Sequence, residues 1–170
     1  MAQLQIEKNV VISRQNGVVR LRSSNSPDEF LIDEKDYEIV KTRCWGVYGN
    51  YMEATVNKKR IKLHILLMGE KDGFVIDHAN RFTLDNRRSN LRWATKSQNA
   101  MNRNKNSNNT SGYIGVYFHK SNGKYRGVIH FNKKGRNCSE TKEFTTAIEA
   151  AKWRDERAKV RHGEFAVLNF

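Results

Sequence analysis

Short apolar runs, separated by polar positions and tight turns, fill the first sixty residues and predict a β-rich section. Two dipeptides, Asn16-Gly17 and Gly49-Asn50, each separate a pair of such runs, which is the pattern of a β-hairpin. Between the hairpins, a polar loop holds the only proline, Pro27, and residues 34–41 favour a short helix. The four expected strands are Val10–Ile12, Val18–Arg22, Cys44–Tyr48 and Tyr51–Val56.

The middle of the chain predicts a strand, a loop, a second strand and a helix. Thr95 and Gln98 have the spacing of a capping box, so a helix is expected to begin directly after Thr95. Upstream, the apolar run Ile61–Met68 suits either a strand or a short helix, and its length does not decide between them. The expected elements are the strand Phe74–Asp77, the loop 79–89, the strand Leu91–Ala94 and a helix over 96–103.

The last third of the chain predicts a three-stranded antiparallel sheet packed on one helix. Thr146 and Glu149 form a second capping-box pattern, and the helix that begins there carries alanines on one face. Small side chains on that face allow the helix to lie close to a sheet. The expected strands are Tyr113–His119, Lys124–Phe131 and Arg136–Phe144.

These elements predict an α+β protein with four parts. A segment rich in Asn and Ser, without apolar residues, predicts a flexible linker between the middle and the end of the chain. The parts are a β-rich section (1–60), a strand-loop-strand-helix core (61–104), the linker (105–112) and a sheet-and-helix module (113–170).

The charge of the chain rises toward its C-terminus. The 170 residues hold 31 Lys and Arg against 18 Asp and Glu, for a net charge of +13. The net charge is +2 over residues 1–60, +4 over 61–104 and +7 over 105–170. An excess this large and uneven favours a nucleic-acid partner.

Composition also argues against several other classes of protein. No run approaches the roughly 20 apolar residues that a membrane-spanning helix needs, so no membrane partner is expected. The first residues lack the pattern of a signal peptide, and two cysteines are too few for a disulfide framework. A cytoplasmic location is therefore expected.

The stretch from Asp77 to Asn99 carries the candidate chemistry. The expected elements fold Asp77-His78, Asn90 and Asn99 back toward one another. Asp77 and Asn99 offer oxygen ligands, which suit Mg²⁺ or Mn²⁺ better than zinc. His78 has an ordinary pKa near neutrality and is the candidate general base, while Asn90 can hold its ring or the loop by a hydrogen bond. Such a set suits hydrolysis of a phosphodiester.

This stretch resembles the HNH endonuclease family, specifically its phage and intron homing type. The matching residues are Asp77-His78, Asp85-Asn86, Asn90-Leu91-Arg92-Trp93 and Ser97-Gln98-Asn99. The resemblance implies a ββα-metal site with one Mg²⁺ or Mn²⁺ ion, held by Asp77 and Asn99. It implies His78 as the general base and Asn90 as the structural asparagine.

Other positions in this stretch differ from the family pattern. Asn80-Arg81 replaces the Asp-Gly that members often have after Asp-His, and Asn99 replaces the His of zinc-binding relatives. Upstream, Ile65 follows His64 where the family has Arg, so His64 is expected to be structural or to face a phosphate rather than to act as the base.

The C-terminal module resembles a second family, the Apetala-type (ethylene-response-factor) DNA-binding domain. The match rests on Ser111–Val116, on Ala147, Ala150 and Ala151, and on the ending Gly163–Phe170. It implies a sheet that lies in the major groove of double-stranded DNA. Alternation along the second strand places basic and polar residues on one face. The expected DNA contacts are Tyr117, His119, Lys124, Arg126, His130, Lys133, Lys134 and Arg136.

The sequence therefore predicts a site-specific homing-type DNA endonuclease with a separate DNA-reading module. Two alternatives stay open: a DNA-binding or regulatory protein without cleavage activity, and a non-specific nuclease. One centre per chain favours a monomer that nicks one strand, and a dimer remains an option. A phage- or intron-encoded member would act in the cytoplasm of a bacterial host.

Overall fold

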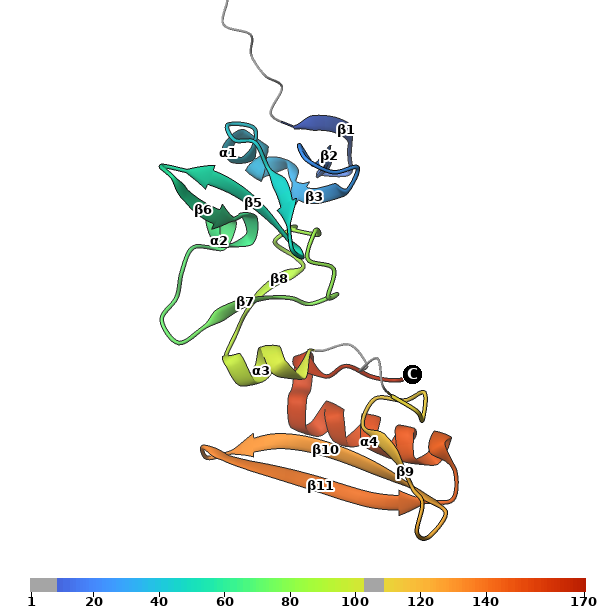
Figure 1. The fold of residues 1–170 in the computed structure, drawn as a ribbon. Helices are drawn as coiled ribbons and strands as arrows, with labels where there is room; N and C mark the ends of the chain where they lie inside the picture. The colour runs from blue at the N-terminus through green and yellow to red at the C-terminus, as the bar shows by residue number, and fades with distance from the viewer. Residues whose placement is uncertain (1–8, 103–108) are drawn as a thin grey trace, which may run out of the picture. The chain divides into compact units, whose positions relative to one another are not determined.

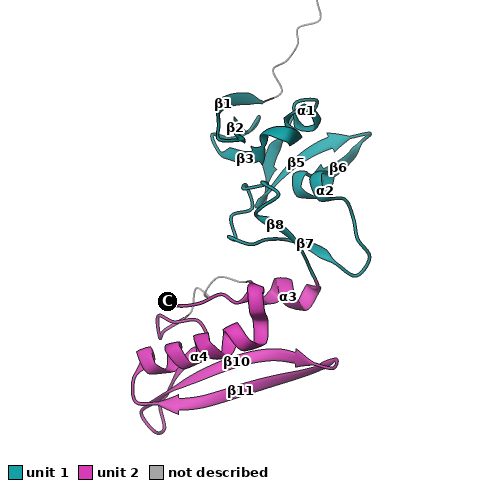
Figure 2. Ribbon diagram, turned by 180° about the vertical axis from the view of Figure 1, so that it is seen from behind, with its two compact units in different colours: residues 1–94 teal, residues 95–170 magenta. Residues whose placement is uncertain are grey.

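The apolar runs fold as short antiparallel strands in the computed structural model, which describes residues 9–102 and 109–170 (Figure 1). These residues form two compact units, and the division falls between Ala94 and Thr95 (Figure 2). The mixture of helices and antiparallel sheets agrees with the predicted α+β class. No helix among the described residues has the length and apolar character that crossing a bilayer requires.

The first unit contains two three-stranded sheets and a two-stranded hairpin. The Asn16-Gly17 turn has positive φ at both residues (52° and 74°), as a tight hairpin needs, and Asn57-Lys58 forms a second such turn (49° and 64°). The strands are β1 (Val10–Gln15), β2 (Val18–Arg22), β3 (Glu29–Asp33), β4 (Gly46–Tyr48), β5 (Tyr51–Val56), β6 (Lys59–Lys62), β7 (Val75–His78) and β8 (Leu91–Ala94). The helices are η1 (Glu34–Asp36), α1 (Tyr37–Val40) and α2 (Leu63–Met68).

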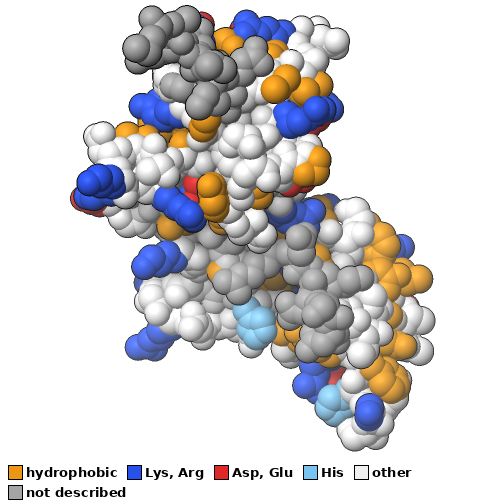
Figure 3. Space-filling view, turned by 45° about the horizontal axis from the view of Figure 1, so that its top comes forward, with side chains coloured by type: hydrophobic (Ala, Val, Ile, Leu, Met, Phe, Trp, Pro, Cys, Tyr) orange, Lys and Arg blue, Asp and Glu red, His pale blue; other side chains and the backbone are white. Residues whose placement is uncertain are grey.

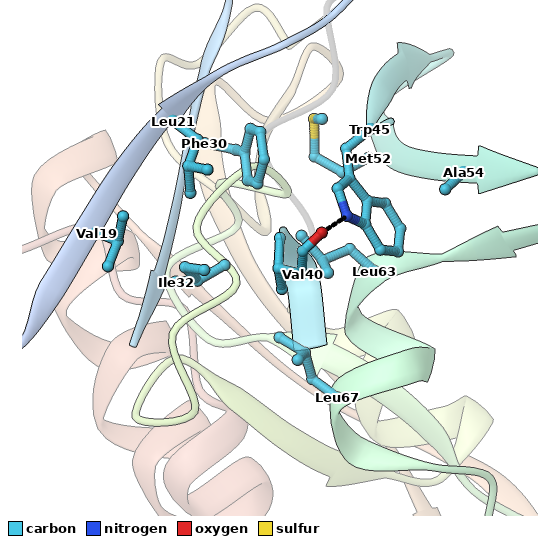
Figure 4. Close-up of a cluster of buried hydrophobic side chains, with 10 residues drawn as sticks. All are labelled: Val19, Leu21, Phe30, Ile32, Val40, Trp45, Met52, Ala54, Leu63 and Leu67. Carbon is cyan, nitrogen blue, oxygen red and sulfur yellow. Dashed lines mark hydrogen bonds between the residues drawn. The ribbon is translucent and has the colours of Figure 1, made fainter. Parts of the chain in front are cut away.

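One apolar core holds this unit together, and Trp45 is its largest side chain (Figure 4). The Trp45 side chain is fully buried, and its indole Nε1 donates to the carbonyl oxygen of Val40 at 2.9 Å. Alternate residues of β2 and β3 point into this core, as the sequence pattern requires. The core therefore joins the first sheet to the β4–β5–β6 sheet and α2.

The second unit contains α3 (Lys96–Met101), β9 (Val116–His119), β10 (Lys124–Lys133), β11 (Arg136–Phe144), α4 (Ala147–His162) and η2 (Gly163–Phe165). The strands form a sheet in the order β11-β10-β9, and α4 contacts all three. Both predicted capping boxes are present, at Thr95 with Gln98 and at Thr146 with Glu149. The helix expected over 96–103 is α3, and its predicted end at residue 103 lies outside the described residues. The same is true of linker residues 105–108.

A buried carboxylate ties the end of the chain to α4. Asp155 accepts hydrogen bonds from the backbone nitrogens of Asn169 (2.6 Å) and Phe170 (3.1 Å). The Asn169 side chain in turn accepts from the Ile114 nitrogen at 2.7 Å. These bonds fix the C-terminal segment beside the residues that lead into β9.

Gly127 marks the closest approach of α4 to the sheet. A Cβ at this position would lie 2.8 Å from a ring carbon of Trp153 and 2.9 Å from the carbonyl oxygen of Ala150. A Gly127→Ala substitution is therefore expected to lower the free energy of unfolding by about 1–3 kcal/mol, because the helix must move away. Urea unfolding measures this change. Ser139→Ala, on the exposed side of β11, is the control, and equal effects of the two substitutions would contradict the close packing.

Candidate active site

The β7–β8 hairpin places the Asp-His pair at the end of a strand. In this pairing Asp77 lies opposite Arg92 and His78 lies opposite Leu91. Both members of the pair are 5% exposed. The predicted base and the predicted metal ligand are therefore adjacent in one strand, on a short and well-paired element.

Asn90 closes the loop that joins the two strands. Its Oδ1 accepts from the backbone nitrogen of Asn80 at 2.9 Å, and its Nδ2 donates to the carbonyl oxygen of Asp85 at 2.8 Å. Both ends of the amide are thus engaged by loop backbone, and its contacts fit the structural role expected for this residue rather than a bond to His78.

Hydrogen bonds also join the loop between β7 and β8 to the β1–β2–β3 sheet. The Leu31 nitrogen donates to the carbonyl oxygen of Leu84 at 2.9 Å, and the Asn86 nitrogen donates back to the Leu31 carbonyl oxygen at 2.8 Å. Arg88 binds the buried carboxylate of Asp36, with Nε 2.9 Å from Oδ2. The strand β3 therefore holds the loop in place against the hairpin.

Inside the loop, Asp85 is a buried anion with matched partners. It accepts from Arg87 Nε at 2.7 Å and from Asn80 Nδ2 at 2.9 Å. Burial acts to raise the pKa of Asp85, but the hydrogen bonds and charge of Arg87, with the Asn80 amide, hold the pKa below its ordinary value. Asp85 therefore stays ionised and helps to fix the loop.

Asn86 is the residue that contacts the candidate base. Its Oδ1 lies 3.4 Å from Nε2 of His78, and its side chain is fully buried. With the proton on Nε2, that nitrogen donates to Asn86 and the lone pair lies on Nδ1. Burial lowers the pKa of His78, although the Asn86 hydrogen bond and the charges of Asp77 and Asp85 oppose the shift. His78 is therefore neutral near neutral pH, the form that accepts a proton.

Two further aromatic side chains surround His78. The His64 ring stands edge-on to it, with ring centres 5.1 Å apart, and the Tyr51 ring centre lies 6.2 Å away. Burial, with the nearby charges of His78 and Lys62, lowers the pKa of His64 to about 4. His64 is thus a neutral packing partner of His78, in line with the structural alternative expected for it.

The low pKa of His64 predicts acid sensitivity of the first unit. The unfolded histidine takes up a proton below pH 6.5 and the folded one only near 4, so stability is lost as the pH falls between these values. From about pH 7 to about pH 5 the loss from His64 is at most about 2 kcal/mol. Urea unfolding across this range measures it, and His64→Phe is expected to flatten the slope. A slope identical to wild type in this variant would contradict the assignment.

Asp77 is paired with a cation within the hairpin. Both Nε and an Nη of Arg92 lie 2.8 Å from Oδ2 of Asp77. A carboxylate with an asparagine, completed by water and substrate phosphate, suits Mg²⁺, which seldom takes an all-protein cage. No group of three or more His, Cys, Asp or Glu side chains gathers for a metal within residues 9–102 and 109–170, and zinc usually requires such a set. Asp77 therefore offers an oxygen donor of the kind that Mg²⁺ takes, and the identity of the ion stays a prediction.

Asn99, the second expected ligand, belongs to the second unit. It lies in α3, whose N-cap Thr95 directly follows β8 in the chain, and its nitrogen donates to the Thr95 carbonyl oxygen at 2.9 Å. The structure brings Asp77, His78 and Asn90 together within the first unit. The pairing of Asn99 with Asp77 stays a prediction.

The expected DNA contacts of the second unit divide between the sheet and its turn. Tyr117 and Arg126 lie opposite each other on the face away from α4, as do His119 and Lys124. His130 is exposed on the same face. The remaining three, Lys133, Lys134 and Arg136, lie at the turn between β10 and β11.

Arg126 has an intramolecular partner that the sequence pattern did not reveal. Its Nη lies 2.8 Å from Oε1 of Glu143, directly across the strands, and Asn122 donates to the same carboxylate at 3.0 Å. The hydrogen bond from Arg126 is the main reason that the pKa of Glu143 is lowered. To contact a DNA base, Arg126 would have to leave the Glu143 carboxylate or bind both groups at once.

A cavity of about 780 Å³ opens beside the same strands. Its lining includes Tyr117 and His130, together with Asn132 and Asn137. Two of the expected DNA contacts therefore border a hollow with both polar and apolar walls, within the second unit.

Comparison with known proteins supports the nuclease interpretation of the central stretch. Residues 68–101 match a family model described as HNH endonuclease. The match spans β7, the loop between β7 and β8, β8 itself and α3. It includes Asp77, His78, Asn90 and Asn99. A search of curated proteins and a search of solved structures each found no match.

Proposed function

We propose that this protein is a site-specific, metal-dependent DNA endonuclease of the homing type, with its cleavage centre at the end of the β7–β8 hairpin. The observation that carries the proposal is the adjacent Asp77-His78 pair, buried in a clamped hairpin within the segment that matches the HNH endonuclease model. Double-stranded DNA is the proposed substrate.

In the proposed reaction, water attacks the phosphorus of one DNA phosphodiester. His78 accepts the proton of that water as the new phosphorus–oxygen bond forms. The bond to the leaving sugar oxygen breaks, and that oxygen takes up a proton, so one of the two new ends of the cut strand carries a phosphate and the other carries a hydroxyl. Asn86 holds the His78 ring, and Asn90 holds the loop that carries Asn86.

Asp77 and Asn99 are the residues that would hold one Mg²⁺ or Mn²⁺ ion. When bound, such an ion neutralises charge that develops on the phosphate during the reaction. Arg92, which contacts Asp77, orients this carboxylate.

For the second unit, the proposed role is recognition of the target site through the face of the β9–β10–β11 sheet that is opposite α4. The Apetala-type resemblance and the exposed polar side chains of this face support the proposal. In this arrangement the residues at the β10–β11 turn contact phosphates, and Arg126 and His130 contact bases.

The experiment that tests the proposed function is incubation of the full-length protein with a library of supercoiled plasmids that carry random inserts, because a site-specific enzyme cuts only the plasmids that hold its site. Conversion of supercoiled to nicked or linear DNA is expected with Mg²⁺ and not with EDTA. Persistence of supercoiled plasmid over a range of protein and Mg²⁺ concentrations would contradict the proposal.

A further inference from the structure

The β4–β5–β6 sheet has one face in the core and one face open to solvent. Met52 and Ala54 of β5 point into the core, at 1% and 3% exposed. Alternation therefore turns Tyr51, Glu53 and Thr55 to the opposite face. The pairing between strands adds three neighbours to this open face: Tyr48 opposite Tyr51, Lys62 opposite Glu53 and Arg60 opposite Thr55.

Two cations lie on two aromatic rings across this face. The Arg60 guanidinium carbon lies 4.0 Å from the centre of the Tyr48 ring, and Lys62 Nζ lies 4.3 Å from the centre of the Tyr51 ring. Such contacts hold a cation in place while its charge remains available to solvent. We call Tyr48, Tyr51, Arg60 and Lys62 the tyrosine platform.

The tyrosine platform is positive on balance. The carboxylate that faces it is Glu53, whose side chain is 13% exposed and lies 3.9 Å from Arg60, whereas the Arg60 side chain is 59% exposed. Lys58 and Lys59, at the adjacent turn, are also exposed. Over the chain as a whole, Figure 3 shows more Lys and Arg than Asp and Glu side chains on the face that it draws, in line with the net charge of +13.

The platform is continuous with the candidate cleavage centre. The Tyr51 ring, which carries Lys62 on it, also contacts the rings of His64 and His78, with centres 5.2 and 6.2 Å away. Lys62 directly precedes α2, the helix that carries His64. A DNA strand that reaches His78 therefore passes beside the platform.

We propose that the tyrosine platform binds the phosphate backbone of double-stranded DNA on the approach to His78. Arg60 and Lys62 contact phosphates, and the two rings hold these cations in position. The choice of DNA as the occupant rests on the proposed nuclease function and on the complementary charge.

Other arginines of the first unit are less suited to this role. Arg20 and Arg22, on β2, both pair with Glu29, at 3.2 and 3.6 Å. Arg14 pairs with Glu34 at 3.0 Å. A cation held close to a carboxylate gains less from a phosphate. Arg60 lies farther from its carboxylate, Glu53, at 3.9 Å, so the DNA contact of the first unit is assigned to the platform rather than to the β1–β2–β3 sheet.

The test compares the binding of a fluorescein-labelled duplex of random sequence by the full-length wild type and an R60Q/K62Q variant, in EDTA so that no cleavage occurs. Each phosphate contact contributes about −0.9 to the slope of log affinity against log salt, so this slope should become shallower by about 1.8. At about 0.1 M salt the Kd should rise by several tens of fold.

The matched control is an R14Q/K41Q variant. It loses the same number of charges, and both of its cations contact the Tyr37 ring, but they pair closely with glutamates, Arg14 with Glu34 at 3.0 Å and Lys41 with Glu38 at 2.5 Å. Its slope should equal that of the wild type. Equal slopes for R60Q/K62Q and the control would overturn the proposal. If the double variant misfolds, Arg60→Gln alone, at a largely exposed side chain, should still change the slope by about 0.9.

This readout is independent of cleavage. A shallower slope for R60Q/K62Q in a protein that fails to cut plasmid would support the platform and contradict the nuclease proposal. An unchanged slope for R60Q/K62Q in a protein that cuts plasmid would contradict the platform and support the nuclease proposal.

Discussion

A His78→Ala variant is expected to cleave DNA about a hundredfold to ten-thousandfold more slowly than the wild type, since a positioned general base contributes rate enhancement of that order. The histidine is buried, neutral near neutral pH and held by Asn86, so it is prepared to accept a proton from water. Removing it leaves the hairpin backbone and the platform in place. DNA affinity should therefore stay close to that of the wild type.

Single-turnover cleavage of plasmid at saturating protein measures this loss, because the rate then reports the chemical step and not binding. His119→Ala is the control, because His119 is a half-buried histidine at the end of β9 in the second unit, and saturating protein removes any effect of the substitution on binding. Its rate at saturation should equal that of the wild type. A His78→Ala rate within about threefold of the wild type would exclude His78 as the base, because general-base catalysis contributes far more.

The second large effect is expected from Asp77→Asn, which keeps the shape of the side chain and removes its charge. The Mg²⁺ concentration that gives half-maximal cleavage should rise at least about tenfold, because even residues that only support a metal ligand affect metal affinity by 10–100-fold. The substitution also leaves Arg92 without its anionic partner, so a lower thermal stability of the first unit is expected as well.

A titration of cleavage rate against Mg²⁺ measures the effect, and Asp72→Asn is the matched control because Asp72 is an exposed residue before the same hairpin. An Asp77→Asn curve that superimposes on the wild-type curve would show that this carboxylate does not hold the ion.

The local parts of the fold could be predicted from the sequence because they depend on neighbouring residues. The Asn16-Gly17 turn needs two residues that accept positive φ, and both capping boxes depend on residues three positions apart. The run 61–68 was ambiguous because it contains the end of β6 and then α2. The strand β3, which follows the loop that holds Pro27, was not predicted.

The composition of the candidate site was visible in the sequence, but its contacts were not. The contact between Asn86 and His78 depends on a loop that Leu31 fastens from more than fifty residues away. His64 and Tyr51 reach His78 only through the packing of α2 and β5, and no spacing along the chain indicates this. Similarly, the pairing of Arg126 with Glu143 follows from strand register rather than from any motif.

The central claim is that water hydrolyses a DNA phosphodiester at the Asp77-His78 centre. The most direct measurement is cleavage of plasmid by the wild type with Mg²⁺ in water enriched in heavy oxygen, followed by mass spectrometry of the new ends. The account predicts one heavy oxygen in the terminal phosphate at each cut, and no such ends from His78→Ala over the same time. Intact plasmid, or cut ends without the heavy oxygen, would contradict it.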